Sequence, residues 1–180
     1  MEVWLNAPAS EGQEGVDAFY SEQNGLDIYC EKGILYRNGA AIGGHVHIDS
    51  SEAQAQARSL AGSVEWILLT FEDWSMIPIE NVIAAVESTP TKVAAQITKP
   101  VEAQGAGFAL DIGVDALLCT EDCLESALIV KSIRLAKPTS EDSSHEDHGQ
   151  QIDLSLMTIT DIQEGHSGDR VCVDLLSMLE

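Results

Sequence analysis

From residue 45 onward the chain alternates short apolar runs with longer segments that carry an apolar residue every three or four positions. Short apolar runs predict buried strands, and the longer spacing predicts amphipathic helices. Residues 45–137 therefore predict about four strand–helix units. The predicted strands are 45–48, 64–71, 92–97 and 114–119; the predicted helices start at Ser50 or Ser51, Pro78, Pro100 and Glu121 and extend to about Ala61, Val86, Ile112 and Ala136.

Such alternation is typical of a parallel sheet with right-handed crossovers. The predicted fold class is α/β, with parallel βα units resembling part of a (β/α) barrel. Four units would make half of an eight-unit barrel. Periodicity leaves open whether the sheet closes into a barrel or stays open.

The chain on either side of these units has a different pattern. Residues 1–44 are poorly patterned: Val16–Tyr20 predict at most a short helix, Leu26–Cys30 is the first plausible strand, and Asn38-Gly39 predicts a turn. Residues 138–151 have the composition of an acidic, flexible loop. Residues 152–180 alternate apolar and polar side chains, as at the start of a β-rich region. Two strands are too few for an independent sheet, so we expect this region to be truncated.

The composition of the chain argues against some classes of binding partner. The formal net charge is −21, from 30 acidic and 9 basic residues. This balance argues against binding to nucleic acid or to an anionic membrane surface. No apolar run approaches the roughly 20 residues of a membrane span, and no secretory signal precedes Ser10. The four cysteines lack metal-type spacing, so we expect reduced thiols in the cytoplasm or plastid stroma. A homo-oligomer is left open.

Ligands of parallel α/β folds collect at the carboxyl ends of the strands. In this chain the rule indicates Asp49, Glu72-Asp73-Trp74, Thr98-Lys99 and Thr120-Glu121. Asp73 is the strongest candidate because it follows the most hydrophobic strand and stands beside a tryptophan. The alternative is that Asp73 caps the next helix and Trp74 packs over the rim of the sheet.

Three further motifs carry weaker signals. The pair His45 and His47 places two imidazoles on one face of a strand, but a third ligand is not evident, so we expect no metal. The sequence Gly105-x-Gly107 resembles a fragment of a dinucleotide fingerprint, yet Leu110 occupies the position of the third glycine, and helix packing explains it better. The pair Asp169-Arg170 is either a turn with a local ion pair or a cationic fork for a carboxylate.

Two segments together resemble the type II 3-dehydroquinate synthase family. The first reads Asp73-Trp74-Ser75-Met76-Ile77-Pro78-Ile79-Glu80-Asn81-Val82-Ile83-Ala84, and the second runs from Thr158 to Gly168-Asp169-Arg170-Val171-Cys172-Val173-Asp174-Leu175. Their order and separation also match the family, and the likeness runs from about His45 to the end of the chain. The acidic insertion resembles the versions found in photosynthetic eukaryotes.

The resemblance implies an NAD-dependent oxidative deamination and cyclisation that turns an amino-dideoxy-heptulosonic acid into 3-dehydroquinate. It further implies Asp73 or Glu80 as the carboxylate acid/base and Arg170 as the holder of the keto-acid substrate's carboxylate. Asp169 and Asp174 would orient Arg170, and Asn81 would donate a hydrogen bond. No NAD-binding residue is assigned.

The sequence also departs from the family. Residues 1–25 match the family's first strand–helix stretch weakly, the family's β-rich second half is missing, and Leu176-Ser177 replaces its usual Cys-Ser. The alternatives are a related synthase of the aminohydroxybenzoate type and an inactive, truncated interaction module.

Overall fold

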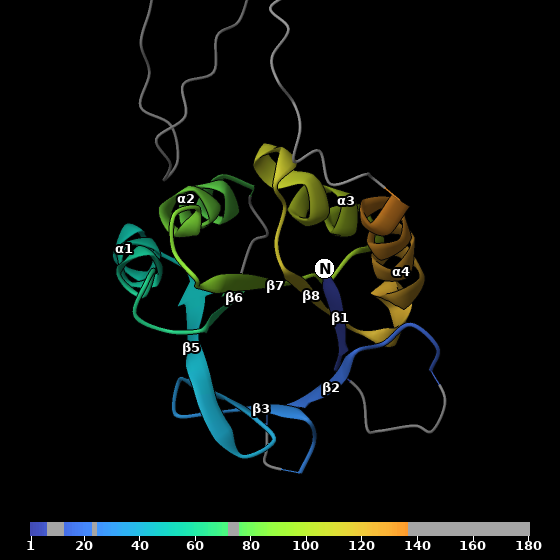
Figure 1. Cartoon of the computed structure of the whole chain (residues 1–180), viewed down its shortest axis with the longest axis horizontal. Coiled ribbons are helices and arrows are strands. Elements are labelled where there is room, and N and C mark those ends of the chain that lie inside the picture. Colours follow the sequence, from blue (N-terminus) through green and yellow to red (C-terminus); the bar gives the residue numbers. More distant parts are fainter. Residues whose placement is uncertain (7–12, 23–24, 72–75, 137–180) are drawn as a thin grey trace, which may run out of the picture.

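The computed structural model describes residues 1–6, 13–22, 25–71 and 76–136. Within these residues the chain forms a mixed α/β barrel (Figure 1). Its elements are β1 (Glu2–Leu5), β2 (Ala18–Ser21), β3 (Ile28–Glu31), β4 (Ile34–Arg37), β5 (Ala40–Ile48), α1 (Ser51–Ser59), β6 (Trp66–Phe71), α2 (Met76–Val86), β7 (Lys92–Gln96), α3 (Pro100–Phe108), the 3₁₀ helix η1 (Ala109–Asp111), β8 (Ala116–Cys119) and α4 (Glu121–Ala136).

The eight strands form one closed sheet in sequence order, and β1 pairs with β8 to complete it. Strand β4 runs antiparallel to β3 and β5, and every other neighbouring pair is parallel. The predicted α/β class and the four βα units, β5–α1 to β8–α4, are confirmed. In the described part of the chain, four α-helices accompany the eight strands, and a strand–turn–strand hairpin supplies part of the wall without a helix.

The poorly patterned residues 1–44 contain strands of the barrel that the sequence pattern does not predict. Strands β1–β4 and the start of β5 lie before residue 45, so the sheet continues across the boundary drawn there. The prediction of a short helix at Val16–Tyr20 is wrong, because Ala18 and Tyr20 are buried in the barrel and the backbone pairs with β1 and β3. A four-residue strand is too short for its alternation to stand out.

Turn chemistry explains the hairpin. Asn38 and Gly39 have φ of 51° and 81° and form a two-residue loop between the paired residues Arg37 and Ala40. Positive φ at both loop positions matches the twist of a tight hairpin, which confirms the predicted turn. The hairpin also makes β5 longer than predicted: the strand begins at Ala40 rather than at His45.

Helix α3 ends at Phe108, four residues before the predicted end. Leu110 and Asp111 adopt left-handed backbone conformations, with φ of 53° and 61°, so the α-helix cannot continue through them. Gly113 then passes so close to the carbonyl of Gly107 that a Cβ atom would lie 2.0 Å from its oxygen. This close approach turns the chain back toward β8.

The core has two layers. One lies between the sheet and the helices and includes Val46, Leu69 and Ile83. The other fills the barrel interior, where the ring centroids of Trp4 and Trp66 are 4.8 Å apart. Helices α1–α4 flank the wall from β5 through β8 to β1, and in the described part of the chain no helix covers β2 and β3 (Figure 1).

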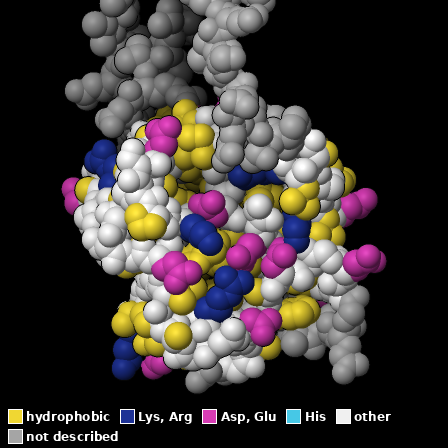
Figure 2. Space-filling view, in the orientation of Figure 1, with side chains coloured by type: hydrophobic (Ala, Val, Ile, Leu, Met, Phe, Trp, Pro, Cys, Tyr) yellow, Lys and Arg dark blue, Asp and Glu magenta, His cyan; other side chains and the backbone are white. Residues whose placement is uncertain are grey.

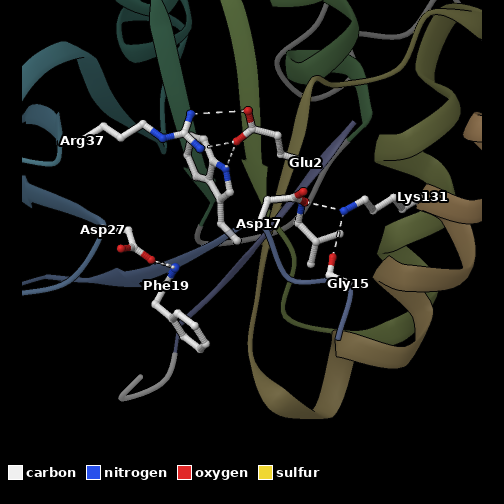
Figure 3. A network of polar contacts seen from close by, with 9 residues as sticks. Glu2, Gly15, Asp17, Phe19, Asp27, Arg37 and Lys131 are labelled. Atoms are coloured by element: carbon white, nitrogen blue, oxygen red, sulfur yellow. Dashed lines mark hydrogen bonds and ion pairs between the residues drawn. The ribbon is translucent and has the colours of Figure 1, made fainter. Parts of the chain in front are cut away.

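Charged side chains tie the amino ends of the strands together. Arg37 Nη2 lies 2.8 Å from Glu2 Oε2, which also accepts a hydrogen bond from Trp4 Nε1 at 2.7 Å (Figure 3). Lys131 of α4 donates to Asp17 Oδ2 at 2.6 Å and to the carbonyl of Gly15. Basic and acidic side chains are interspersed over the centre of the face shown in Figure 2. At this end of a barrel, such contacts serve stability.

Two predicted segments, the acidic loop at 138–151 and the β-rich region at 152–180, lie outside the described residues. Among the helices that are described, none is long and apolar enough to cross a membrane.

Candidate functional site

The carboxyl ends of the seven parallel strands open at one end of the barrel, which we call the mouth. Leu68 of β6 is buried in the barrel interior, and because side chains alternate along a strand, Thr70 faces the same way two residues nearer the mouth. His45 and His47 of β5 pair with Leu68 and Thr70 and therefore share this face. Cys30, near the end of β3, packs against the same interior core.

Four of these side chains form a hydrogen-bonded chain, which we call the mouth cluster: Cys30, His45, Thr70 and His47. His45 Nδ1 lies 3.5 Å from Cys30 Sγ, and its Nε2 lies 2.8 Å from Thr70 Oγ1. His47 Nδ1 reaches the same hydroxyl oxygen at 3.0 Å. The backbone N–H of His45 donates to the carbonyl of Gly33 at 2.9 Å, which fixes the start of this row.

Electrostatics keep the inner members of the mouth cluster neutral. Burial lowers the pKa of His45, and the neighbouring His47 lowers it further, although Glu22 acts in the opposite direction. Burial raises the pKa of Cys30, with Glu22 adding to the rise and the backbone N–H of Gly33 opposing it. At neutral pH the pair is therefore a thiol and a neutral imidazole, not a thiolate–imidazolium pair.

A phenol stands beside this pair. Tyr20 of β2 is buried at the inner side of Cys30, and burial, Cys30 and Glu22 raise its pKa to about 12. It is therefore a hydrogen-bond donor at neutral pH rather than a base. The mouth thus combines a neutral base with neutral donors, which is what acid–base chemistry on a charged substrate requires.

The residues predicted on the β6–α2 connection are only partly described. Glu80 is buried on α2 between residues that face the core. Asn81, next to it, has a buried Nδ2 that finds no acceptor among the described residues. An amide donor in this position costs free energy unless something accepts its hydrogen bond, which suits the predicted role of Asn81 toward a substrate. Asp73 itself lies outside the described residues.

The predicted anion holder and its neighbours, Arg170, Asp169 and Asp174, also lie outside the described residues. That they meet the β6–α2 connection in one pocket stays a prediction. The other strand ends singled out in the sequence start helices. Glu102 Oε2 accepts hydrogen bonds from the backbone N–H groups of Thr98 and Lys99 at 2.7 and 3.0 Å, so this carboxylate caps α3.

The starts of α1, α3 and α4 do not fit the pyrophosphate of a dinucleotide. Backbone N–H groups at a helix N-terminus attract phosphate, but acidic residues occupy the first turns of α1, α3 and α4, at Glu52, Glu102 and Glu121-Asp122. These carboxylates would repel a diphosphate. In the part of the chain that is described, no group of three or more His, Cys, Asp or Glu side chains could hold a metal ion.

A shallow groove also runs along the outer face of α4, lined by Leu124, Leu128 and Ile129 together with Glu121, Glu125 and Ser132. It offers no imidazole and no hydrogen-bonded row like that of the mouth, so we place the candidate site at the mouth.

The sequence predicts part of this site. His45 and His47 stand out in it, but only as a possible metal pair, and Cys30, Thr70 and Tyr20 are not among the predicted residues. The matching alternation in His45-x-His47 and Leu68-x-Thr70 carried a signal, since adjacent parallel strands place such residues side by side. Cys30 carried none, because its position depends on the hairpin.

Fold and site together define an α/β barrel whose mouth holds a bonded thiol–imidazole–hydroxyl row. Residues 6–136 match the family described as 3-dehydroquinate synthase II N-terminal domain. The chain therefore belongs to the type II 3-dehydroquinate synthase family. The match begins at residue 6, so it includes strands β2–β4, whereas the likeness seen in the sequence began at about His45.

Individual relatives agree with this assignment. The 3-dehydroquinate synthase of Halobacterium salinarum is 35% identical over 143 residues, which are 79% of this chain and 34% of the relative. That of Methanothrix thermoacetophila is 34% identical over 142 residues, 78% of this chain and 36% of the relative. That of Haloquadratum walsbyi is 30% identical over 186 aligned residues, 95% of this chain and 44% of the relative.

The chain thus spans less than half the length of these relatives. No solved structure matches it.

Proposed function

We propose that the protein is a 3-dehydroquinate synthase of type II, which converts 2-amino-3,7-dideoxy-threo-hept-6-ulosonate to 3-dehydroquinate by oxidative deamination and cyclisation. The observation that carries the proposal is the family match over residues 6–136, a stretch that includes every described strand from β2 to β8. The relatives bear the name 3-dehydroquinate synthase.

The reaction sets three requirements for the protein. A base must take a proton from the substrate's ammonium group before the carbon beside it can be oxidised. A cation must hold the substrate carboxylate, and an acid/base must exchange a proton with the enolate that closes the ring. The oxidation releases two electrons and a proton as hydride, and NAD as part of this proposal supplies the acceptor.

The mouth cluster suits the first requirement. A general base acts in its unprotonated form, and burial keeps His45 in that form at neutral pH. We further assign Asp73 or Glu80 as the carboxylate acid/base and Asn81 as a hydrogen-bond donor to the substrate. Among the described residues no acceptor is found for the buried Nδ2 of Asn81, which supports its assignment.

Few cations are available for the second requirement. Among the described cations, Arg37 and Lys131 form ion pairs at the amino end of the barrel. Arg134 donates to the backbone carbonyls of Gly107 and Val114. We assign Arg170 as the holder of the substrate carboxylate, with Asp169 and Asp174 orienting its guanidinium group. Lys99, exposed at the carboxyl end of β7, would add a second positive charge on the mouth side.

NAD is part of the proposal only because the oxidation needs an acceptor for two electrons and a proton. Because the starts of α1, α3 and α4 do not fit its pyrophosphate, we derive no step through the cofactor and assign it no residue.

The test uses the protein purified from its own source cells, which carries whatever sequence flanks residues 1–180. It is incubated with the amino-heptulosonate and NAD, and absorbance at 340 nm, ammonia and 3-dehydroquinate are measured together. We expect all three to rise in equal amounts. Without 3-dehydroquinate the proposal is wrong, and turnover of a different amino-ketone would favour the related aminohydroxybenzoate-type synthase instead.

A further inference from the structure

We propose that the mouth cluster is a proton relay, which carries one proton at a time between Cys30 in the barrel and His47 at the surface. The proposal rests on the proposed function for the reaction it serves, but its wiring follows from the hydrogen bonds alone.

The hydroxyl of Thr70 links the two histidines of the row. Two imidazole nitrogens, His45 Nε2 at 2.8 Å and His47 Nδ1 at 3.0 Å, approach the same oxygen. A hydroxyl has a single hydrogen to donate, so at most one of these nitrogens can accept from it and the other must donate to it. When the Thr70 hydrogen bonds within the row, one histidine accepts from it and the other donates to it, so the tautomers of His45 and His47 are coupled through Thr70.

Two neutral arrangements bond all three contacts and also use the Thr70 hydrogen within the row. In the first, the thiol of Cys30 donates to His45 Nδ1, His45 Nε2–H donates to Thr70, and Thr70 donates to His47 Nδ1. In the second, His47 Nδ1–H donates to Thr70, Thr70 donates to His45 Nε2, and His45 Nδ1–H donates to Cys30 Sγ, which lies 3.5 Å away. The same three contacts serve both arrangements.

One passage of a proton converts the first arrangement into the second. As a substrate proton binds Cys30 Sγ, the thiol proton moves to His45 Nδ1, so that Cys30 passes the proton to the base His45. The Nε2 proton of His45 moves to Thr70 Oγ1. The Thr70 proton then moves to His47 Nδ1, and His47 releases its Nε2 proton to water. One proton enters, one leaves, and no net charge remains on a buried group.

The reverse passage returns one proton and restores the first arrangement. This matches the proposed reaction, in which a proton leaves the ammonium group before oxidation and another proton is needed at ring closure.

The row reaches the surface at one end. Cys30, His45 and Thr70 are half-buried, and His47 is exposed. The groups that face the row from other elements are Tyr20 and Glu22. A charge held on the inner members would be costly, and burial accordingly lowers the pKa of His45 and raises that of Cys30. A neutral relay avoids this cost.

The wiring is tested without activity, on ¹⁵N-histidine-labelled protein. At pH 8 we expect both His45 and His47 to carry their proton on Nε2, or both on Nδ1, and we expect Thr70→Val to break this pairing while Thr70→Ser keeps it. Threonine and valine have nearly the same shape, so the comparison isolates the hydroxyl. If His45 and His47 hold opposite tautomers in the wild type, or if Thr70→Val leaves both unchanged, the relay is wrong, whatever reaction the protein catalyses.

Its use in catalysis is tested on the wild-type protein and the same variants. We expect Thr70→Val to lower kcat by about tenfold or more with little change in KM, Thr70→Ser to restore most of the rate, and His47→Gln to be rescued by added imidazole buffer. If the wild type makes 3-dehydroquinate and Thr70→Val is as fast as Thr70→Ser, the relay is overturned and the proposed function stands. If the wild type makes none, the proposed function fails and the tautomers still decide the wiring.

Discussion

Replacing Gly43 with alanine tests the register that closes the barrel between β5 and β6. Gly43 pairs with Trp66, and a Cβ atom added to it would lie 1.7 Å from the Trp66 carbonyl oxygen and 2.6 Å from the carbonyl carbon. Real Cβ atoms essentially never come within 3.0 Å of another heavy atom, so the two strands would have to separate by more than an ångström. Trp66 is almost fully buried beside Trp4, and the shift would therefore disturb the interior core.

Forcing atoms into a packed site typically costs 1–3 kcal/mol, and the obstacle here is backbone rather than a movable side chain, so we expect a loss of about 3 kcal/mol in the free energy of unfolding. The lower chain entropy of alanine in the unfolded state offsets only about 0.4–1 kcal/mol of such a loss.

The neighbouring glycine supplies a matched control. A Cβ at Gly44 would meet only the Cδ1 atom of Leu60 at 2.9 Å, the end of a side chain that can rotate away. Gly44→Ala should therefore stay within about 1 kcal/mol of the wild type. Urea unfolding followed by tryptophan fluorescence measures both variants. Equal stability of the two would mean that the β5–β6 register is not the one described.

Three further outcomes follow from particular contacts. Because the pKa of His45 is depressed, the unfolded chain binds more protons than the folded one, so the free energy of unfolding should fall as the pH drops below about 6.5. Urea unfolding at pH 5 and pH 7 measures this drop, which should be smaller for His45→Gln than for the wild type. Glu2→Gln weakens the ion pair between Arg37 and Glu2, whose side chains are 28% and 29% exposed, and should cost about 1 kcal/mol in thermal unfolding without changing the titration of His45. A larger loss at high salt than at low salt would contradict this. Cys119 is 1% exposed, and burial raises its pKa to about 12. Peptide mapping should therefore find it unmodified by iodoacetamide at pH 8 until urea unfolds the chain. Rapid labelling of the folded protein would be inconsistent with its position.

The sequence predicts the second half of the barrel far better than the first. Strands such as Trp66–Phe71 are covered on both faces and appear as continuous apolar runs, and each helix between them has its own period. The four-residue strands β1–β4 lack this signal, partly because Glu2 and Arg37 place charges at the end of the barrel interior, where alternation alone would require apolar residues. Closure depends on which strands pair, and local pattern does not carry that information.

The candidate site shows the same division. His45 and His47 are conspicuous in the sequence, but their partner Thr70 is an ordinary strand residue whose role appears only once β5 and β6 are in register. Cys30 joins them only because the hairpin brings β3 and β5 to either side of β4. The predicted pocket between Asp73 and Arg170 depends on residues outside the described part of the chain, so it stays a prediction.

The most direct test of the central claim, that the mouth of this barrel carries out the chemistry of 3-dehydroquinate formation, compares the wild-type protein with His45→Gln, and with Glu2→Gln as a control at the opposite end. The measurement is kcat/KM for 3-dehydroquinate formed from the amino-heptulosonate and NAD, with folding of each variant checked by circular dichroism. We expect His45→Gln to lose about a hundredfold or more and Glu2→Gln to keep its rate. A folded His45→Gln protein as active as the wild type would contradict the claim.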